Sequence, residues 1–102
     1  MTIVLRGVNV FPTQIEELLL RVPGLAPHFQ LVRTSRDHVD ELTVHVEARP
    51  GLDAAQRSAA AGALAALVRD NVGVRVDVFV ADPDTIERSA GKMRRVIDRR
   101  GT

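Results

Sequence analysis

The first third of the chain changes from a strand-like to a helix-like pattern of apolar residues. Residues 2–5 are apolar or β-branched and lead through Arg6 and Gly7 into residues 8–10. This pattern predicts a short strand, a glycine-permitted bend and a second extended segment. Four apolar residues then recur at helical spacing: Ile15, Leu18, Leu19 and Val22. The recurrence predicts a helix whose apolar stripe faces a sheet or another helix.

Local capping signals set the expected bounds of this helix. Pro12 is expected to close the preceding strand, and Thr13 with Glu16 has the spacing of a capping box. In that motif the threonine oxygen accepts the N3 backbone N–H, and the glutamate accepts the backbone N–H of the cap residue. Pro23 and Gly24 are expected to end the helix.

The middle of the chain has the pattern of a β-hairpin. Residues 28–35 contain three large apolar side chains and predict one strand, and residues 42–47 alternate between apolar and polar positions and predict another. The mostly polar segment 36–40 suits the connection between them.

A helix and a strand are predicted to follow this hairpin. Asp53 and Gln56 form a capping pair, and residues 54–70 are rich in alanine and leucine, which favour helix. Gly73 fits the C-cap. Valine then occupies every second position in residues 74–81, which is the strongest strand pattern in the chain.

These elements follow the order β-α-β-β-α-β, the split βαβ arrangement of ferredoxin-like domains. We therefore predict an α+β fold in a single domain over residues 1–102, with the helices on one face of the sheet. Residues 82–102 are expected to form a basic C-terminal tail, an appendage after the last strand. The residues with candidate chemistry lie mainly in this tail.

Composition narrows the class of protein. The 102 residues are 45% hydrophobic and 26% charged, as in packed globular domains. A formal net charge of +1, with Phe as the only aromatic residue type, argues against binding to nucleic acid or to an anionic membrane. The absence of cysteine excludes disulfides and thiolate metal sites, and the histidines are too scattered to predict a metal site. No apolar run approaches the ~20 residues of a membrane helix, so we expect a soluble, cytoplasmic protein.

One lysine lies in a glycine-containing, basic segment of the tail. Lys92 follows Gly91, and Arg88 and Ser89 precede them. A lysine ammonium is a compact charge with three donors, which suits contact with a carboxylate or a phosphate oxygen. The segment is not a phosphate-binding P-loop, because Met93 stands where that motif requires serine or threonine. Taken alone, the Gly-Lys pair indicates only a solvated lysine.

Several segments in order along the chain give this lysine a context, because together they resemble the C-terminal domain of phenylacetate-CoA ligases. They are residues 6–17 (RGVNVFPTQIEE), 23–30 (PGLAPHFQ), 40–44 (DELTV) and 91–98 (GKMRRVID). Such ligases belong to the adenylate-forming superfamily, with acyl-CoA synthetases and luciferases. The likeness spans essentially the whole chain and rests on several motifs rather than one.

The resemblance implies a mobile lid with two poses. In the adenylating pose, Lys92 would approach the acyl carboxylate and the α-phosphate of ATP and stabilise the charge there. In the thioester-forming pose, the lysine would move away, and Arg6, Gly7, Val8 and Asn9 would line the passage for the pantetheine arm of CoA. Two half-reactions would then share one site through a hinge motion.

The resemblance also implies supporting residues and cofactors. Arg88, Ser89 and Gly91 would shape the lysine loop, and Arg94 and Arg95 are candidates for phosphate contacts, with a solvated basic cluster as the other interpretation. The complete enzyme would need ATP, Mg²⁺ and CoA. This chain alone is expected to bind none of them and is assigned no metal ligand.

The expected partner is a large nucleotide-binding domain, in the same polypeptide or in a separate one. That domain and the hinge aspartate expected just before Met1 are not in the sequence, so the chain alone should be catalytically inactive. Glu87 and Ala90 depart from the proline and the acidic residue that are frequent in the family's lysine loop. The alternative is a freestanding βαββαβ binding module, such as a homodimer, that has lost the ligase reaction. Neither hypothesis includes nucleic acid or a membrane as a partner.

Overall fold

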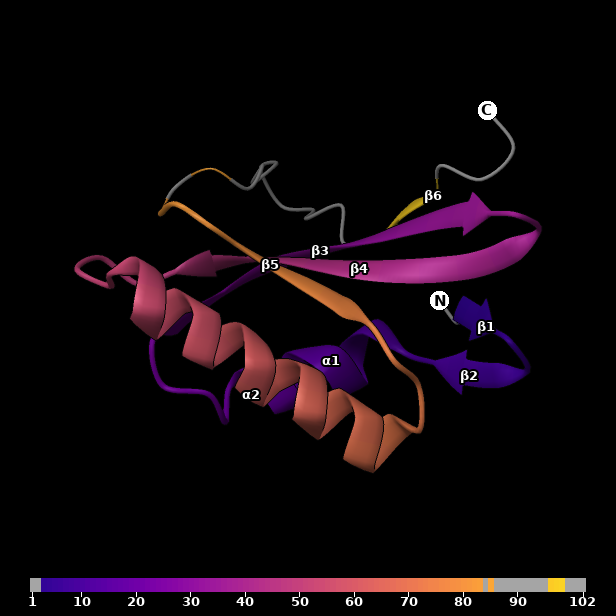
Figure 1. Ribbon diagram of the computed structural model, residues 1–102. Helices are drawn as coiled ribbons and strands as arrows, with labels where there is room; N and C mark the ends of the chain where they lie inside the picture. The colour runs from indigo at the N-terminus through magenta and orange to yellow at the C-terminus, as the bar shows by residue number, and fades with distance from the viewer. Residues whose placement is uncertain (1–2, 84, 86–95, 99–102) are drawn as a thin grey trace, which may run out of the picture.

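The chain forms two β-sheets, the larger of which has helices packed on one face (Figure 1). The computed structural model describes residues 3–83, 85 and 96–98. The elements are β1 (Ile3–Leu5), β2 (Val8–Val10), α1 (Pro12–Leu19), β3 (Leu25–Arg36), β4 (Val39–Ala48), α2 (Ala54–Val72), β5 (Asp77–Ala81) and β6 (Val96–Asp98). The predicted α+β class is confirmed.

The larger sheet has the strand order β5-β4-β3-β6. Strands β3 and β4 form the predicted antiparallel hairpin, which turns at Asp37 and His38. Strand β5 follows α2 and pairs parallel with β4, so β4, α2 and β5 form a βαβ unit. Strand β6 pairs parallel with the free edge of β3, with Val96 opposite Leu31.

The structure corrects the expectation that residues 82–102 are an appendage, because Val96–Asp98 forms β6 and belongs to the larger sheet. This strand covers a β3 edge that would otherwise present unpaired backbone groups. Strands β1 and β2 form a separate two-stranded sheet, whereas the split βαβ arrangement placed the first strand in the main sheet. The tight turn at Arg6 and Gly7 returns the chain directly onto itself, so β1 pairs with β2.

Helix α1 starts two residues earlier than the capping pattern predicted, and the expected Thr13–Glu16 box is wrong. Pro12 is the first helical residue and Phe11 is the N-cap. Proline has a pre-set φ and no N–H that needs a partner, so it favours the first position of a helix. Gln14 therefore occupies the third position, where its Oε1 accepts the Phe11 N–H at 3.0 Å. The helix also ends at Leu19, before the predicted stop at residues 23–24.

Helix α2 has the caps that were predicted from its sequence. The Asp53 carboxylate accepts the Gln56 backbone N–H at 2.7 Å, and the Gln56 side chain accepts the Asp53 N–H at 2.9 Å. At the other end, Gly73 has a φ of 87° and donates its N–H to Arg69 O at 3.1 Å. These local bonds satisfy groups that a helix end leaves without partners, so they fix both ends of α2.

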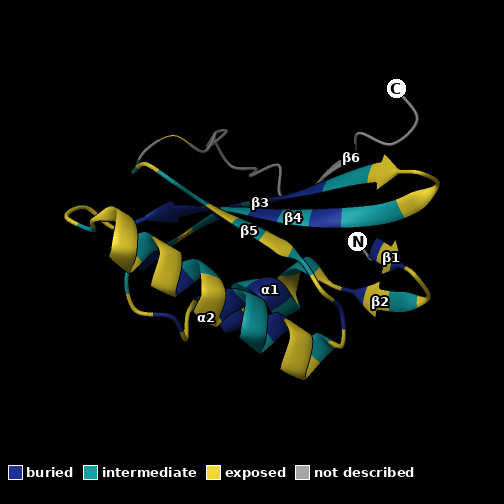
Figure 2. Ribbon diagram, in the orientation of Figure 1, coloured by how far each residue is buried: buried dark blue, intermediate teal, exposed yellow. Residues whose placement is uncertain are grey.

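The core lies between the helices and the larger sheet (Figure 2). The four residues of the predicted apolar stripe are all buried, three of them in α1 and one just after it: Ile15, Leu18, Leu19 and Val22. They share one cluster with Phe29, Leu64 and the inward-facing side chains of β3 and β4. In the described part of the chain, neither helix combines the length and apolar composition that crossing a membrane would require.

Candidate functional site

The lysine loop lies outside the described residues. This applies to Lys92 and to the other tail residues with proposed roles: Arg88, Ser89, Gly91, Arg94 and Arg95. The strands that flank them in the sequence, β5 and β6, are at opposite edges of the larger sheet. With neighbouring strands about 4.8 Å apart, these edges are separated by roughly 14 Å.

The sheet face that points away from the helices is partly apolar. Phe79 on β5 pairs with His45 on β4, and the two ring centroids are 5.4 Å apart. Phe79 is nevertheless 56% exposed. Glu47, two residues after His45 and therefore on the same face, is only 1% exposed. This face thus combines an exposed aromatic ring with a buried carboxylate.

The structure brings the predicted pantetheine-passage residues together in one protruding hairpin. Arg6 and Gly7 form its turn, with φ of 50° and 82°, and Val8 and Asn9 begin the returning strand. Both φ values are positive, as in the two-residue turns that match the twist of a β-hairpin. A Cβ built at Gly7 would meet no atom within 4 Å, so the backbone here is open to an approaching ligand.

A partly buried ion pair fixes this hairpin to the larger sheet. The Arg33 Nη2 atom on β3 donates to Asp40 Oδ2 at 2.8 Å and to the backbone oxygen of Val4 at 2.7 Å. The side chains of Arg33 and Asp40 are 14% and 25% exposed, so water screens this pair only weakly. One guanidinium therefore connects β1, β3 and β4.

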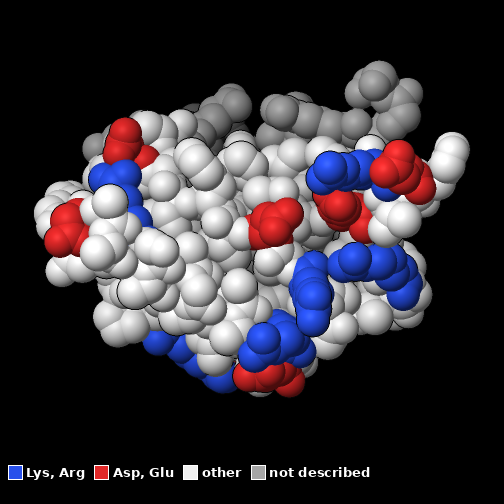
Figure 3. Space-filling model, viewed as in Figure 1, with Lys and Arg blue, Asp and Glu red and all other residues white. Residues whose placement is uncertain are grey.

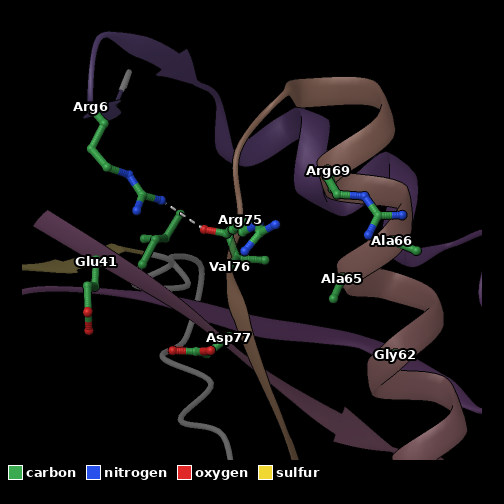
Figure 4. A pocket seen from close by; sticks show the side chains of 10 residues that line it. Arg6, Glu41, Gly62, Ala65, Ala66, Arg69, Arg75, Val76 and Asp77 are labelled. Atoms are coloured by element: carbon green, nitrogen blue, oxygen red, sulfur yellow. Dashed lines mark hydrogen bonds between the residues drawn. The ribbon is translucent and has the colours of Figure 1, made fainter.

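Arg6 extends the hairpin toward the end of α2 (Figure 4). Its Nη2 atom donates to the backbone oxygen of Arg75 at 3.1 Å, between segments that are 69 residues apart in the sequence. A pocket of about 400 Å³ opens beside this contact. Its lining consists of Arg6, Glu41, Leu42, Gly62, Ala65, Ala66, Arg69, Arg75, Val76 and Asp77.

Sequence reasoning did not identify Arg69 and Arg75 as site residues. Arg69 lies in the last turn of α2, and Arg75 lies between α2 and β5. Their proximity to Arg6 depends on how the hairpin docks on the domain, and no local pattern reports that. Figure 3 shows Arg side chains gathered in a band from the β1–β2 hairpin to the C-terminal end of α2.

Comparison with protein families gives a match over nearly the whole chain. The model of the AMP-binding enzyme C-terminal domain matches residues 7–100. Phenylacetate-coenzyme A ligase of Aromatoleum evansii is 43% identical over 103 residues, an alignment that covers 96% of this chain and 23% of that protein. The corresponding ligase of Escherichia coli K12 is 39% identical over 101 residues, with the same coverage. The chain thus spans about a quarter of the length of these relatives.

Solved structures show the same relationship. A crystallised domain of phenylacetate-coenzyme A ligase from Bacteroides vulgatus superposes with a TM-score of 0.87 at 30% identity, covering 99% of this chain and 94% of that one. A 2-hydroxyisobutyryl-CoA ligase in complex with 2-HIB-AMP and CoA gives a TM-score of 0.82 at 30% identity. That alignment covers 98% of this chain and 21% of the ligase.

Proposed function

Because this chain belongs to the family of AMP-binding enzyme C-terminal domains, we propose that it is the mobile lid of a phenylacetate-CoA ligase-like enzyme. The complete enzyme would activate an aryl or acyl carboxylate with ATP and then transfer the acyl group to CoA. The match over residues 7–100 carries this proposal, because it includes both the Gly7 turn and the Lys92 segment in one family model.

The two parts of the chain would serve different half-reactions. In the adenylating pose, the Lys92 ammonium would stabilise the negative charge that develops between the carboxylate and the α-phosphate. In the thioester-forming pose, the open backbone at Gly7 would border the pantetheine passage. The Arg33 ion pair would keep that turn in a fixed orientation on the rotating domain. In the complete enzyme, ATP with Mg²⁺ would supply the adenylyl group that activates the carboxylate, with pyrophosphate leaving, and CoA would supply the thiol that displaces AMP.

The solved states of one relative support the idea of a rotating lid. The 2-hydroxyisobutyryl-CoA ligase has been solved in an open conformation, in a postadenylation state and in a thioesterification state. The partner in our proposal is a large nucleotide-binding domain, in the same polypeptide or in trans. We expect the complete enzyme in the cytoplasm.

A hybrid enzyme tests this function. The chain would replace the corresponding domain of the Aromatoleum evansii ligase, which is 43% identical to it. We expect the hybrid to form phenylacetyl-CoA and AMP, while the large domain without a lid and this chain alone release AMP only at background rates. Steady AMP release by the isolated chain with ATP, CoA and phenylacetate would contradict the proposal. A correctly folded hybrid that forms neither acyl-adenylate nor thioester would also contradict it.

A further inference from the structure

An ion pair holds the chain at the point where it leaves β5 toward the Lys92 segment. Arg57, the fourth residue of α2, donates from its Nη1 atom to Asp82 Oδ1 at 2.5 Å. Asp82 directly follows Ala81, the last residue of β5. The pair joins positions that are 25 apart in the sequence. It therefore restrains the chain that follows the strand rather than the strand itself.

Two local features restrain the same short stretch. Pro83 has a φ that its ring fixes, so the chain after Asp82 has less conformational freedom. The Thr85 hydroxyl donates to the backbone oxygen of Asp82 at 2.6 Å, and a hydroxyl bond of this kind closes a turn. We call Asp82, Pro83 and Thr85 the loop root. The ion pair with Arg57 fixes this loop root to α2.

Neither helix stability nor core packing accounts for the position of Arg57. The helix dipole disfavours a cation near the N-terminus of a helix. The core cluster that contains Leu64 of α2 already packs against Val78 of β5. Arg57 and Asp82 instead border an open hollow of about 290 Å³, and the Asp82 side chain is 72% exposed. Because such an exposed pair contributes little to global stability, its main effect is on the loop root.

The direction of the loop root matters because Lys92 comes shortly after it. Lys92 follows Thr85 by seven residues and precedes Val96 by four. The pairing of Val96 with Leu31 fixes the other end of this segment, at the opposite edge of the larger sheet. The conformations open to a segment depend on where both of its ends are held. A change at the loop root therefore changes where the lysine ammonium can be delivered.

We propose that Arg57 is a positioning residue for adenylation, because its ion pair with Asp82 sets the direction in which the Lys92 segment leaves the sheet. The proposal rests on the function proposed above, in which Lys92 stabilises charge at the carboxylate and the α-phosphate. Arg57 acts through Lys92 and does not itself contact the substrate. Thioester formation is assigned to the Gly7 turn, so it should not depend on the Arg57–Asp82 pair.

Nuclear magnetic resonance on the 102-residue chain tests whether Arg57 holds the loop root. In Arg57→Gln, the amide order parameters at Asp82 and Thr85 should fall from about 0.85 toward about 0.6, with no change at the buried Val46. Arg57→Glu combined with Asp82→Arg should restore them, because the opposite charges are exchanged.

Arg21→Gln is the matched control for these measurements. The Arg21–Glu17 pair also has a carboxylate that is 72% exposed, but it lies on α1 and at its end. This variant should leave the loop root unchanged. If Arg57→Gln alters the order parameters at Asp82 and Thr85 no more than Arg21→Gln does, the pair does not hold the loop root and the proposal is wrong.

The hybrid ligase tests the consequence for catalysis. Arg57→Gln should slow acyl-adenylate formation by roughly fivefold, because a displaced catalytic group reaches the reacting geometry less often. Thioester formation from preformed acyl-adenylate should change by less than about twofold. The charge-exchanged double variant should recover adenylation, and Arg21→Gln should not affect it. Equal urea midpoints for the two glutamine variants would show that a folding defect is not the cause.

The outcomes separate this proposal from the lid function. If the hybrid with the unchanged lid is active, an equal loss in both half-reactions, or no recovery in the double variant, would overturn the role of Arg57 alone. If the hybrid with the unchanged lid forms no acyl-adenylate, the lid function fails, and the role of Arg57 in adenylation fails with it.

Discussion

Two hairpin turns in this molecule have similar backbone geometry but different sources of stability. Two consecutive residues have positive φ in each: Arg6 and Gly7 at 50° and 82°, and Asp37 and His38 at 51° and 66°. The second turn closes the long ladder between β3 and β4, whereas the first closes only the short pairing of Ile3–Leu5 with Val8–Val10. A short two-stranded ribbon is marginally stable by itself.

The short hairpin is therefore held by contacts from elsewhere in the domain. Arg33 bonds to the backbone of Val4, and Arg6 bonds to the backbone of Arg75. The longer hairpin is stabilised by its own strand pairs, which offset the cost of a turn without glycine. The turn assigned to CoA is thus positioned by tertiary contacts, and changes in those contacts should affect it first.

The largest expected effect comes from Arg33→Met. This change leaves the partly buried Asp40 carboxylate and the Val4 carbonyl without the guanidinium, so we expect a loss of about 2 kcal/mol in the free energy of unfolding in urea. Amide exchange should accelerate in residues 3–10 more than at Asp37 and His38.

Arg21→Met is the matched control for this change, because the Arg21–Glu17 pair has side chains that are 54% and 72% exposed. Such exposed pairs contribute about 0.5 kcal/mol or less. If Arg33→Met were no more costly than this control, the anchoring role of Arg33 would be wrong.

A smaller loss is expected from Gly7→Val. No atom lies within 4 Å of the added Cβ, so the cost comes from forcing a β-branched residue into a φ of 82°. We expect about 1–2 kcal/mol, measured by urea unfolding. Gly7→Asn should cost less, because asparagine tolerates this region. Equal costs for valine and asparagine would show that the turn can change its geometry freely.

The smallest effect, and one of opposite sign, is expected from His38→Gly. His38 has a φ of 66°, which glycine adopts without the steric cost of a Cβ. The variant should be more stable by about 0.5–1 kcal/mol, detected as a higher urea midpoint with unchanged slope. A destabilised variant would indicate that the His38 side chain makes a contact that outweighs its backbone strain.

Local chemistry explains which parts of the fold could be predicted from the sequence. Asp53, Gln56 and Gly73 make cap hydrogen bonds with residues only three to five positions away in the sequence. The ends of α2 could therefore be predicted from the sequence. The pairing of β6 could not be predicted, because three residues beside a basic segment carry little strand signal. Whether they form a strand depends on the free edge of β3, which is far away in the sequence. Pro12 was expected to end a strand but is the first residue of α1, because proline suits both a strand end and a helix start.

The candidate site also contains residues that the sequence could indicate and residues that it could not. Resemblance to a family indicated residues 6–9, and the structure places them in one turn. Arg75 was missed because its contact with Arg6 joins positions 69 apart, which neither periodicity nor spacing can report. The role of Lys92 stays a prediction, since this residue lies outside the described part of the chain.

The most direct test of the lid hypothesis measures both half-reactions in the hybrid ligase with Lys92→Ala. Acyl-adenylate formation should fall by about 100-fold, because a charge aimed at the developing anion is lost. Thioester formation from preformed acyl-adenylate should change by less than about threefold, because the proposal has Lys92 away from the reaction centre in that pose. An equal loss in both half-reactions would contradict the division of roles between the lysine loop and the Gly7 turn.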